Sequence, residues 1–358
     1  MAQKEYIKGR GSQKNTHNRF LKHQHTIESD FLNYCYQENE ASDSNRTEYI
    51  EIFPKTILNK VNSPDIGMAY SMNPYQGCEH GCIYCYARNT HEFWGYSAGL
   101  DFERKILVKK NAPELLEAKL KSKNWKAHPI MFSGNTDCYQ PIEKKLKITR
   151  SMLEVLYKYR HPVGFITKNS LIIRDLDILT EMAKLNLVHV SISITSLQES
   201  TRRLLEPRTA STTKRLKTVK TLADHNIPVN VMLAPIIPSI NSHELFDMVK
   251  AASEMGALSA AYTLVRLNGA IGDLFTDWVY RTFPDRAKKI LNQIRDCHGG
   301  QLNDSRFGTR MRGEGQIAQQ IAMQFKLALK KYMSNSCLPP YNFKLYHQMK
   351  NPQLDLFN

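Results

Sequence analysis

Between residues 67 and 266 the chain alternates short apolar runs with stretches of helical periodicity, and this alternation restricts its fold more than any other feature. The pattern is typical of βα units, whose strands pair in parallel within one sheet. The expected strands are residues 68–72, 130–133, 163–167, 188–194, 229–234 and 261–265. About six such units predict an α/β fold, a partial (β/α)6 barrel, with its chemistry at the C-terminal ends of the strands.

The sequence outside this alternation predicts three further parts. Residues 1–65 are expected to form a basic, largely irregular N-terminal extension to the barrel, which spans residues 66–270. Helices expected over residues 277–296 and 316–332 make residues 271–335 a helical extension that closes the open side of the barrel, followed by a tail over residues 336–358. The sequence contains no run of about twenty apolar residues, so no membrane span is expected.

The balance of charge favours a polyanionic partner. The chain has 49 Lys and Arg against 34 Asp and Glu, a net charge of +15. Such a field attracts nucleic acid, although many ordinary enzymes are also basic. Residues 8–23 are cationic and too poor in apolar residues to fold alone, so they are expected to form an arm or a solubilising end. A second cationic run, residues 202–220, is either a nucleic-acid contact or the solvated face of a helix.

Three cysteines, Cys78, Cys82 and Cys85, follow the first expected strand with C-x3-C-x2-C spacing. A loop of this spacing can place three thiolates around a [4Fe–4S] cube. Because such cubes usually take four cysteines, one iron is left open for a ligand that takes part in chemistry. The alternative is a structural zinc site completed by His80 or Cys35. Zinc sites favour paired half-sites on separate turns, and no second half-site follows in the sequence.

The other cysteines are scattered singly along the chain. They are Cys35, Cys138, Cys297 and Cys337. An odd total of seven, together with a polar N-terminal sequence unlike a signal peptide, indicates a reduced cytoplasmic setting and argues against a disulfide framework.

The cysteine loop with its flanks, residues 73–88, resembles the radical S-adenosylmethionine (SAM) superfamily, in the branch grouped with spore photoproduct lyase and also called DNA repair photolyases. Segments 136–143, 167–170, 191–195 and 234–238 are similar to that branch in the same order. With residues 8–11 and 306–310, the resemblance covers most of the chain, and it is greater to members of unassigned function than to the lyase itself. It implies a radical SAM barrel, a [4Fe–4S] cluster and SAM as cofactors, and an electron-donating reductase such as flavodoxin or ferredoxin.

The resemblance also implies contacts to the amino-acid part of SAM at successive strand ends. The backbone N–H and C=O groups of Gly134, Asn135 and Thr136 would meet the methionyl ammonium. Lys168 would supply a cation for the carboxylate, and Ser193 would reach the same carboxylate or the ribose. Taken singly, Lys168 fits equally well as a surface ion pair and Ser193 as an ordinary strand-end hydroxyl.

Two more residues are implied at the adenine. Ala234 is small enough to let adenine approach the backbone, and Tyr84 matches the aromatic residue that lies along it in this superfamily.

Tyr86 and Cys138 are the candidates for hydrogen-atom transfer. Tyr86 matches a tyrosine that relays a hydrogen atom in spore photoproduct lyase, which also needs a cysteine donor near its second strand. Cys138 lies in that neighbourhood but follows the turn that the lyase's donor precedes. This departure argues against thymine-dimer repair, and a buried thiol that fills space is the alternative for Cys138.

The implied reaction is reductive cleavage of SAM to methionine and a 5′-deoxyadenosyl radical that abstracts hydrogen from a C–H bond. The lyase-like branch and the basic charge favour nucleic acid as substrate. A peptide or small metabolite is the alternative substrate, and a non-enzymatic zinc- or cluster-bearing nucleic-acid-binding protein is the alternative to an enzyme.

The C-terminal residues Gln353 to Phe357 resemble the short peptide by which bacterial replication and repair proteins dock on the sliding clamp of DNA polymerase. A glutamine amide and apolar anchors on a free tail suit adjoining pockets. The alternative is a tail whose Leu and Phe fold back onto the protein.

Overall fold

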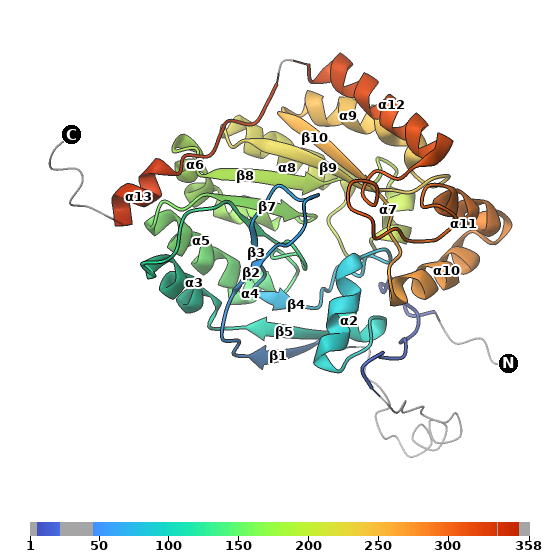
Figure 1. The fold of residues 1–358 in the computed structure, drawn as a ribbon, viewed down its shortest axis with the longest axis horizontal. Coiled ribbons are helices and arrows are strands. Elements are labelled where there is room, and N and C mark those ends of the chain that lie inside the picture. The colour runs from blue at the N-terminus through green and yellow to red at the C-terminus, as the bar shows by residue number, and fades with distance from the viewer. Residues whose placement is uncertain (1–5, 22–45, 335, 351–358) are drawn as a thin grey trace.

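The computed structural model describes residues 6–21, 46–334 and 336–350, and its framework is a seven-stranded sheet of order β10-β9-β8-β7-β6-β3-β2. The strands are β2 (Leu58–Lys60), β3 (Tyr70–Met72), β6 (Ile130–Phe132), β7 (Val163–Thr167), β8 (Val188–Ser193), β9 (Val229–Ile236) and β10 (Ser259–Leu264). Successive strands from β3 to β10 pair in parallel, and β2 pairs antiparallel with β3. The six parallel strands overlap the six expected ranges, which confirms the predicted α/β barrel fold (Figure 1).

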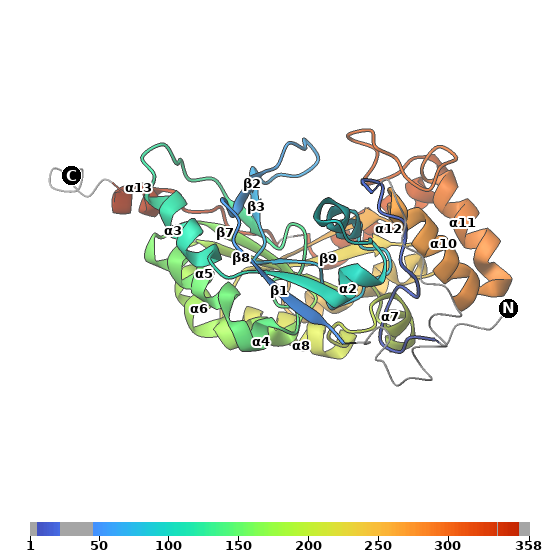
Figure 2. The ribbon, with the colours of Figure 1, turned by 90° about the horizontal axis from the view of Figure 1, so that it is seen from below.

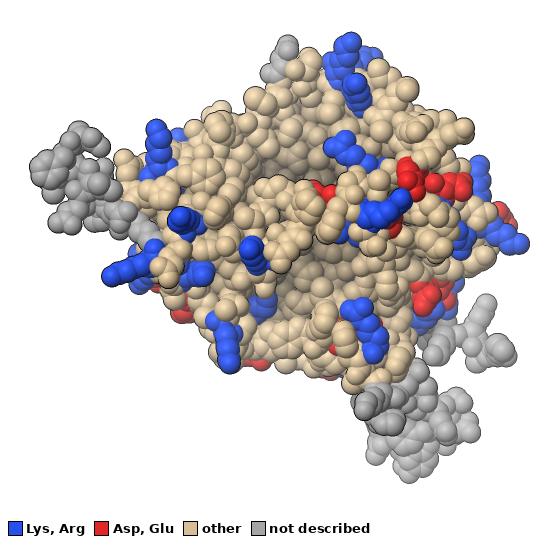
Figure 3. All heavy atoms as spheres, in the orientation of Figure 1, with Lys and Arg blue, Asp and Glu red and all other residues tan. Residues whose placement is uncertain are grey.

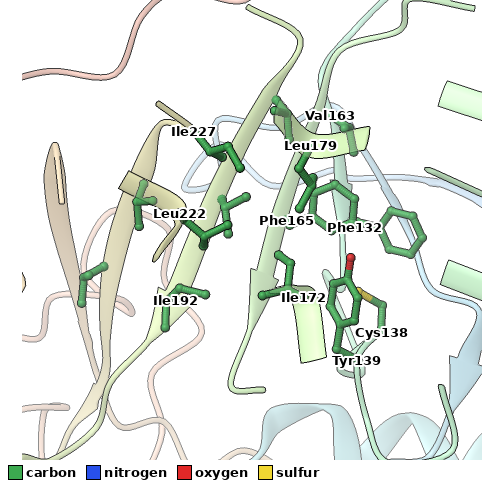
Figure 4. Close-up of a cluster of buried hydrophobic side chains, with 14 of the residues drawn as sticks. Phe132, Cys138, Tyr139, Val163, Phe165, Ile172, Leu179, Ile192, Leu222 and Ile227 are labelled. Carbon is green, nitrogen blue, oxygen red and sulfur yellow. The ribbon is translucent and has the colours of Figure 1, made fainter. Parts of the chain in front are cut away.

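Helices follow these strands and cover the outside of the sheet (Figure 1). They are α3 (Ala112–Lys121), α4 (Glu143–Leu146), α5 (Ile148–Lys158), η2 (Ser170–Asp175), α6 (Leu176–Lys184), α7 (Glu199–Leu205), α8 (Thr212–Asp224), η3 (Ser242–Glu244) and α9 (Leu245–Glu254). The largest apolar core lies between these helices and the sheet, where the rings of Phe132 and Phe165 stack with centroids 4.9 Å apart (Figure 4). Burial of this apolar surface fixes the strand ends that carry the site.

A second, three-stranded sheet of order β1-β5-β4 was not anticipated. It combines β1 (Glu48–Ile52), β4 (Tyr75–Gln76) and β5 (Lys105–Lys109), and the short helices η1 (Tyr86–Trp94) and α2 (Leu100–Arg104) lie between β4 and β5 in the chain. The N-terminal extension, expected to be largely irregular over residues 1–65, therefore supplies a strand to each sheet. The sequence pattern did not reveal β1 because its parallel partner β5 is distant in the chain.

The C-terminal part is helical as expected, with one difference (Figure 2). The helix expected over residues 277–296 is divided into α10 (Ala270–Thr282), η4 (Pro284–Arg286) and α11 (Ala287–Asp296), because Pro284 cannot donate a helical hydrogen bond. The expected helix 316–332 is α12 (Gly315–Tyr332), which packs on α9 through Phe246 and Tyr332, with ring centroids 5.4 Å apart.

After α12 the chain returns to the far side of the barrel. The hydroxyl of Tyr346, on α13 (Lys344–Lys350), donates to the carbonyl of Leu120 on α3 at 2.8 Å. Of the helices in the described residues, none is both long and apolar enough to cross a membrane.

Candidate active site

The cysteine loop, residues 77–85, lies between β4 and η1, and its backbone is held from several sides. The N–H of Cys78 donates to the carbonyl of Phe102 on α2 at 2.9 Å, and the N–H of Ile83 donates to the carbonyl of Leu205 on α7 at 3.1 Å. The Gln140 side chain accepts from the Glu79 N–H at 3.0 Å and donates to the loop's first carbonyl at 3.2 Å. The loop is thereby fixed beside the segments that follow β6 and β8.

The three cysteine thiols of this loop lie in one buried group. Cys78 and Cys82 are buried and Cys85 is half-buried. Burial raises the pKa of each thiol, and at Cys78 the Asp137 carboxylate and the other two cysteines raise the pKa further. Metal binding requires the thiolate form and releases these protons. Three cysteine sulfurs in one loop are the donors that a cluster with one open iron needs, so the donor set fits an iron–sulfur cluster.

The zinc alternative needs a fourth ligand, and His80 is engaged elsewhere. Its Nδ1 lies 3.3 Å from Asp137 Oδ2, and its Nε2 lies 3.4 Å from the Asn169 amide nitrogen. The other candidate, Cys35, lies outside the described residues. Within the described residues, no three His, Cys, Asp or Glu side chains, the three loop cysteines included, converge closely enough to hold a single metal ion. A [4Fe–4S] cube binds each thiolate at a different iron, so it does not require that convergence.

Asp137 joins His80 to the end of β7. Burial opposes its ionisation, but His80, the Lys168 N–H and the Thr167 hydroxyl lower the pKa of Asp137 to about 2. The N–H of Lys168 donates to this carboxylate at 2.8 Å and the Thr167 hydroxyl does so at 2.8 Å. The Asp137 carboxylate therefore positions both the cysteine loop, through His80, and Lys168, whose ammonium is the cation expected to pair with SAM.

Lys168 brings a positive charge to the cysteine loop. Its ammonium lies 5.9 Å from the centre of the Tyr84 ring. Burial lowers the pKa of Lys168, but the Glu206 carboxylate and the Cys82 thiol outweigh burial, so the pKa is raised above its usual value. The structure thus brings together Lys168, Tyr84 and Cys82, which are distant in the sequence, at the C-terminal end of β7.

Glu206 is the central polar residue of this region, and the sequence reasoning missed it. It is fully buried and accepts from the Tyr84 hydroxyl, from the Thr195 hydroxyl at 2.5 Å and from the Arg215 guanidinium. Burial disfavours the charge, but Arg215 and Lys168 lower the pKa of Glu206 to about 2. Glu206 therefore fixes the Tyr84 ring and compensates the charge of Lys168.

The cationic run 202–220 is accordingly not a uniform solvated face. Arg215 is 1% exposed and Arg202 is 4% exposed. Arg202 donates to the carbonyl of Glu206 at 2.6 Å, and Arg215 donates to the carbonyl of Ser193 at 2.9 Å. These two cations support the site from within, so they are not free to contact a polyanion. Their burial could not be inferred without knowing where Glu206 lies.

The turn after β6 carries Gly134, Asn135 and Thr136, and two of its N–H groups already have partners. The Asn73 side chain accepts from the N–H groups of Asn135 at 2.9 Å and Thr136 at 3.2 Å. The carbonyl of Gly134 accepts from the Tyr86 hydroxyl at 2.5 Å. An ammonium group needs acceptors, so the turn would have to meet it with carbonyl oxygens rather than with the N–H groups expected to take part.

The remaining SAM candidates lie at the ends of the next two strands. Ser193 ends β8 and is buried, and Ala234 is half-buried near the end of β9. Asn241 ties these strand ends together, since its amide donates to the carbonyls of Thr195 at 2.6 Å and Pro235 at 3.0 Å.

Tyr86 and Cys138 lie in different surroundings. Tyr86 is 55% exposed and extends to the turn after β6. Cys138 is fully buried in the apolar core beside Tyr139, as Figure 4 shows. Burial and the neighbouring Asp137 raise the pKa of Cys138 well above its usual value. These surroundings favour the space-filling alternative for Cys138.

The N-terminal segment, expected to be a free arm, packs against the cysteine loop. The N–H groups of Gly11 and Ser12 donate to the Glu103 carboxylate at 3.0 and 2.8 Å, and Arg88 pairs with the same carboxylate at 2.5 Å. Arg88 also donates to the carbonyl of Cys82 at 3.0 Å. A side chain on Gly11 would lie 1.8 Å from the carbonyl oxygen of Gly81, so the close approach requires glycine.

Comparison with known proteins gives consistent matches. A family model described as the radical SAM superfamily matches residues 72–252. An uncharacterized protein of Mycobacterium tuberculosis is 29% identical over 248 residues, which cover 68% of this chain and 73% of that protein. An uncharacterized protein of Methanocaldococcus jannaschii is 29% identical over 251 residues, which cover 70% of this chain and 89% of that protein.

Among solved structures, a spore photoproduct lyase mutant with bound AdoMet and dinucleoside spore photoproduct has a similar fold. Its TM-score is 0.58 with 14% identity, and the match covers 82% of each chain. A second lyase structure, of a mutant with one cysteine replaced by serine, has a TM-score of 0.57 with 15% identity and 79% coverage of each chain. At this identity the likeness concerns the fold.

Proposed function

The chain belongs to the radical SAM superfamily, whose enzymes use a [4Fe–4S] cluster and SAM, and we propose that it abstracts hydrogen from a nucleic-acid substrate. The observation that carries the radical chemistry in this proposal is the meeting of the three loop thiols, two buried and one half-buried, with the Lys168 ammonium and the Tyr84 ring at the C-terminal end of the parallel sheet. Membership of an enzyme superfamily sets aside the non-enzymatic zinc-protein alternative.

Cys78, Cys82 and Cys85 would hold the cluster. The bound cofactors supply a 5′-deoxyadenosyl radical that abstracts hydrogen, and the protein's part is to bind, orient and exclude water. Lys168 would pair with the SAM carboxylate, and the Tyr84 ring, fixed by Glu206, would lie along adenine. Gly134, Asn135 and Thr136 would offer carbonyl oxygens to the ammonium, Ser193 a hydroxyl to the carboxylate or ribose, and Ala234 an open approach to adenine.

Tyr86 is proposed as the hydrogen-atom relay. Its ring is exposed at the strand ends, while its hydroxyl is held by the carbonyl of Gly134. Cys138 is proposed as a packing residue rather than a donor, because its thiol lies within the apolar core.

Two observations support nucleic acid as the substrate class. The net charge is +15, and the fold is similar to that of a lyase solved with a dinucleoside photoproduct. On the face in Figure 3, Lys and Arg side chains are scattered among uncharged ones and do not form a continuous stripe. The charge therefore supports general attraction to a polyanion.

The test is anaerobic turnover of reconstituted enzyme with SAM and dithionite. 5′-Deoxyadenosine is measured with DNA, ultraviolet-irradiated DNA, RNA or no addition. Stimulation by one nucleic acid, with a product of altered mass, is expected. Equal release in all four reactions, with stimulation instead by a peptide or metabolite extract, would refute the substrate class.

We further propose a cytoplasmic enzyme that receives electrons from flavodoxin or ferredoxin and docks on the sliding clamp through Gln353 to Phe357. These five residues lie outside the described residues, so the clamp proposal rests on the sequence. A peptide of residues 351–358 is expected to bind purified clamp at micromolar affinity or weaker, because few buried atoms offset its ordering. Failure to compete with a known clamp ligand would remove this partner.

A further inference from the structure

Arg266, which follows β10 at the same end of the barrel as the cysteine loop, carries a charge that has no ion-pair partner among the described residues. Its Nε is buried without a hydrogen-bond partner. Its Nη1 lies 3.7 Å from the sulfur of Met311, a weak acceptor. Within the described residues, no carboxylate oxygen lies within 4.0 Å of this guanidinium, the distance of an ion pair. Burial lowers the pKa of Arg266.

The nearest carboxylates are already committed to other arginines. Asp65 pairs with Arg310, and Asp304 pairs with Arg306 at 2.8 Å. Burial and the charge of Arg310 lower the pKa of Arg266, and the attraction of Asp65 and Asp304 does not outweigh them. A half-buried guanidinium with an unpaired N–H costs free energy unless a ligand supplies the missing acceptor.

Arg266 also lies at the candidate active site. The segment that carries Arg266 lies against η1, the 3-10 helix that begins at Tyr86 directly after Cys85, because a side chain of η1 donates to a carbonyl of that segment. Asn89 is three residues beyond Tyr86 on the 3-10 helix η1, where such side chains lie on one face. Asn89 donates to the carbonyl of Asn268 at 2.8 Å, and the side-chain oxygens of both asparagines are buried without partners.

We propose that Arg266 binds a phosphate oxygen of the nucleic-acid substrate and, with Asn89 and Asn268, forms a nucleotide-binding site next to Tyr86. A nucleotide carries the two groups that this cluster lacks: an anionic oxygen for the guanidinium and N–H donors for the amide oxygens. This inference rests on the proposed function, and it adds the residues that would place a nucleotide against the relay tyrosine.

The first test is thermal stability. Arg266→Met removes a charge without an ion-pair partner and a buried N–H without an acceptor, and it keeps most of the side-chain volume, so the melting temperature should stay the same or rise. Arg310→Met is the matched variant, because Arg310 is held by Asp65 and by Ser63 at 2.5 Å and its loss should lower the melting temperature. A fall with Arg266→Met as large as that with Arg310→Met would make Arg266 structural and overturn the proposal.

The second test is binding of a fluorescent single-stranded DNA 20-mer at several salt concentrations. Arg266→Met should weaken affinity about tenfold or more and reduce the slope of log K against log salt by about one. Arg286→Met, at an exposed arginine on η4, should change neither. Unchanged affinity and slope in Arg266→Met would overturn the proposal.

The SAM carboxylate is the other source of an anionic oxygen. A raised KM for SAM in dithionite-driven cleavage without DNA, with unchanged DNA affinity, would assign Arg266 to SAM and overturn the phosphate assignment. If the unmodified enzyme binds no DNA, the proposed substrate class fails. The rise in melting temperature that inorganic pyrophosphate causes then tests the anion site. A rise in the unmodified enzyme that is lost in Arg266→Met supports the site, and no rise in the unmodified enzyme refutes it.

Discussion

Replacing Glu103 by Gln should weaken both the fold and the cysteine loop. The Glu103 carboxylate is fully buried and accepts from Arg88 at 2.5 Å and from the N–H groups of Gly11 and Ser12. Gln keeps the shape and removes the charge, which leaves the buried Arg88 guanidinium uncompensated. Breaking one side of a buried ion pair costs about 3–5 kcal/mol, a large part of a domain's stability.

Urea denaturation followed by circular dichroism measures this loss, and iron content after anaerobic reconstitution measures the state of the loop. Iron content should fall because Arg88 also holds the carbonyl of Cys82. The control is Glu117→Gln, whose partner Lys158 lies 2.7 Å away at the surface, where an ion pair contributes little. Glu103→Gln with the stability and iron content of Glu117→Gln would refute the reasoning.

A double variant separates the charge from the contacts. Arg88→Met together with Glu103→Gln removes both charges, so it should be less destabilised than the sum of the single variants. Strict additivity would show that the two side chains act independently, contrary to their geometry.

Three further outcomes are expected. Alanine at Cys78, Cys82 or Cys85 should abolish the iron–sulfur absorbance and SAM cleavage, whereas Cys297→Ala should keep both. Full iron content in any of the three cluster-cysteine variants would disprove the ligand assignment. Lys168→Ala should keep iron but raise the KM for SAM about tenfold, and an unchanged KM would exclude the carboxylate contact. Burial lowers the pKa of His161 to about 4, and its neutral Nε2 accepts from the Trp125 indole at 3.1 Å. The contribution of His161 to stability is therefore present above about pH 6.5 and is lost as the pH falls towards 4. A His161→Gln variant should lose less stability over that pH range, and identical curves of stability against pH would contradict this.

The strands and the cysteine loop were predictable because each has a local signature. Buried parallel strands are short apolar runs, and the C-x3-C-x2-C spacing lies within eight residues of sequence. The second sheet was not predictable, because the largely exposed strand Glu48–Ile52 gains its order only by pairing with Lys105–Lys109.

The buried charges were missed for the same reason. Glu206 and Arg215 look like ordinary surface residues in the sequence, and only their meeting with Tyr84 and Thr195 makes them part of the site. Residues 8–12 look like a free cationic segment until Glu103 is seen to bind their backbone. Local sequence patterns indicate only contacts between residues that are near in the sequence. The partners of Glu206, Arg215 and residues 8–12 are distant in the sequence and are brought to them by the tertiary fold.

The docking of the N-terminal segment has a consequence for the order in which the protein matures. Gly11 and Ser12 leave the ribosome early, but the carboxylate that holds them comes more than ninety residues later, on α2. The cysteines between these two points therefore appear before their support is complete. We expect the iron–sulfur machinery to load the cluster after α2 has folded, and a newly made chain stalled before Glu103 to present its three thiols unsupported to oxygen and to competing metals.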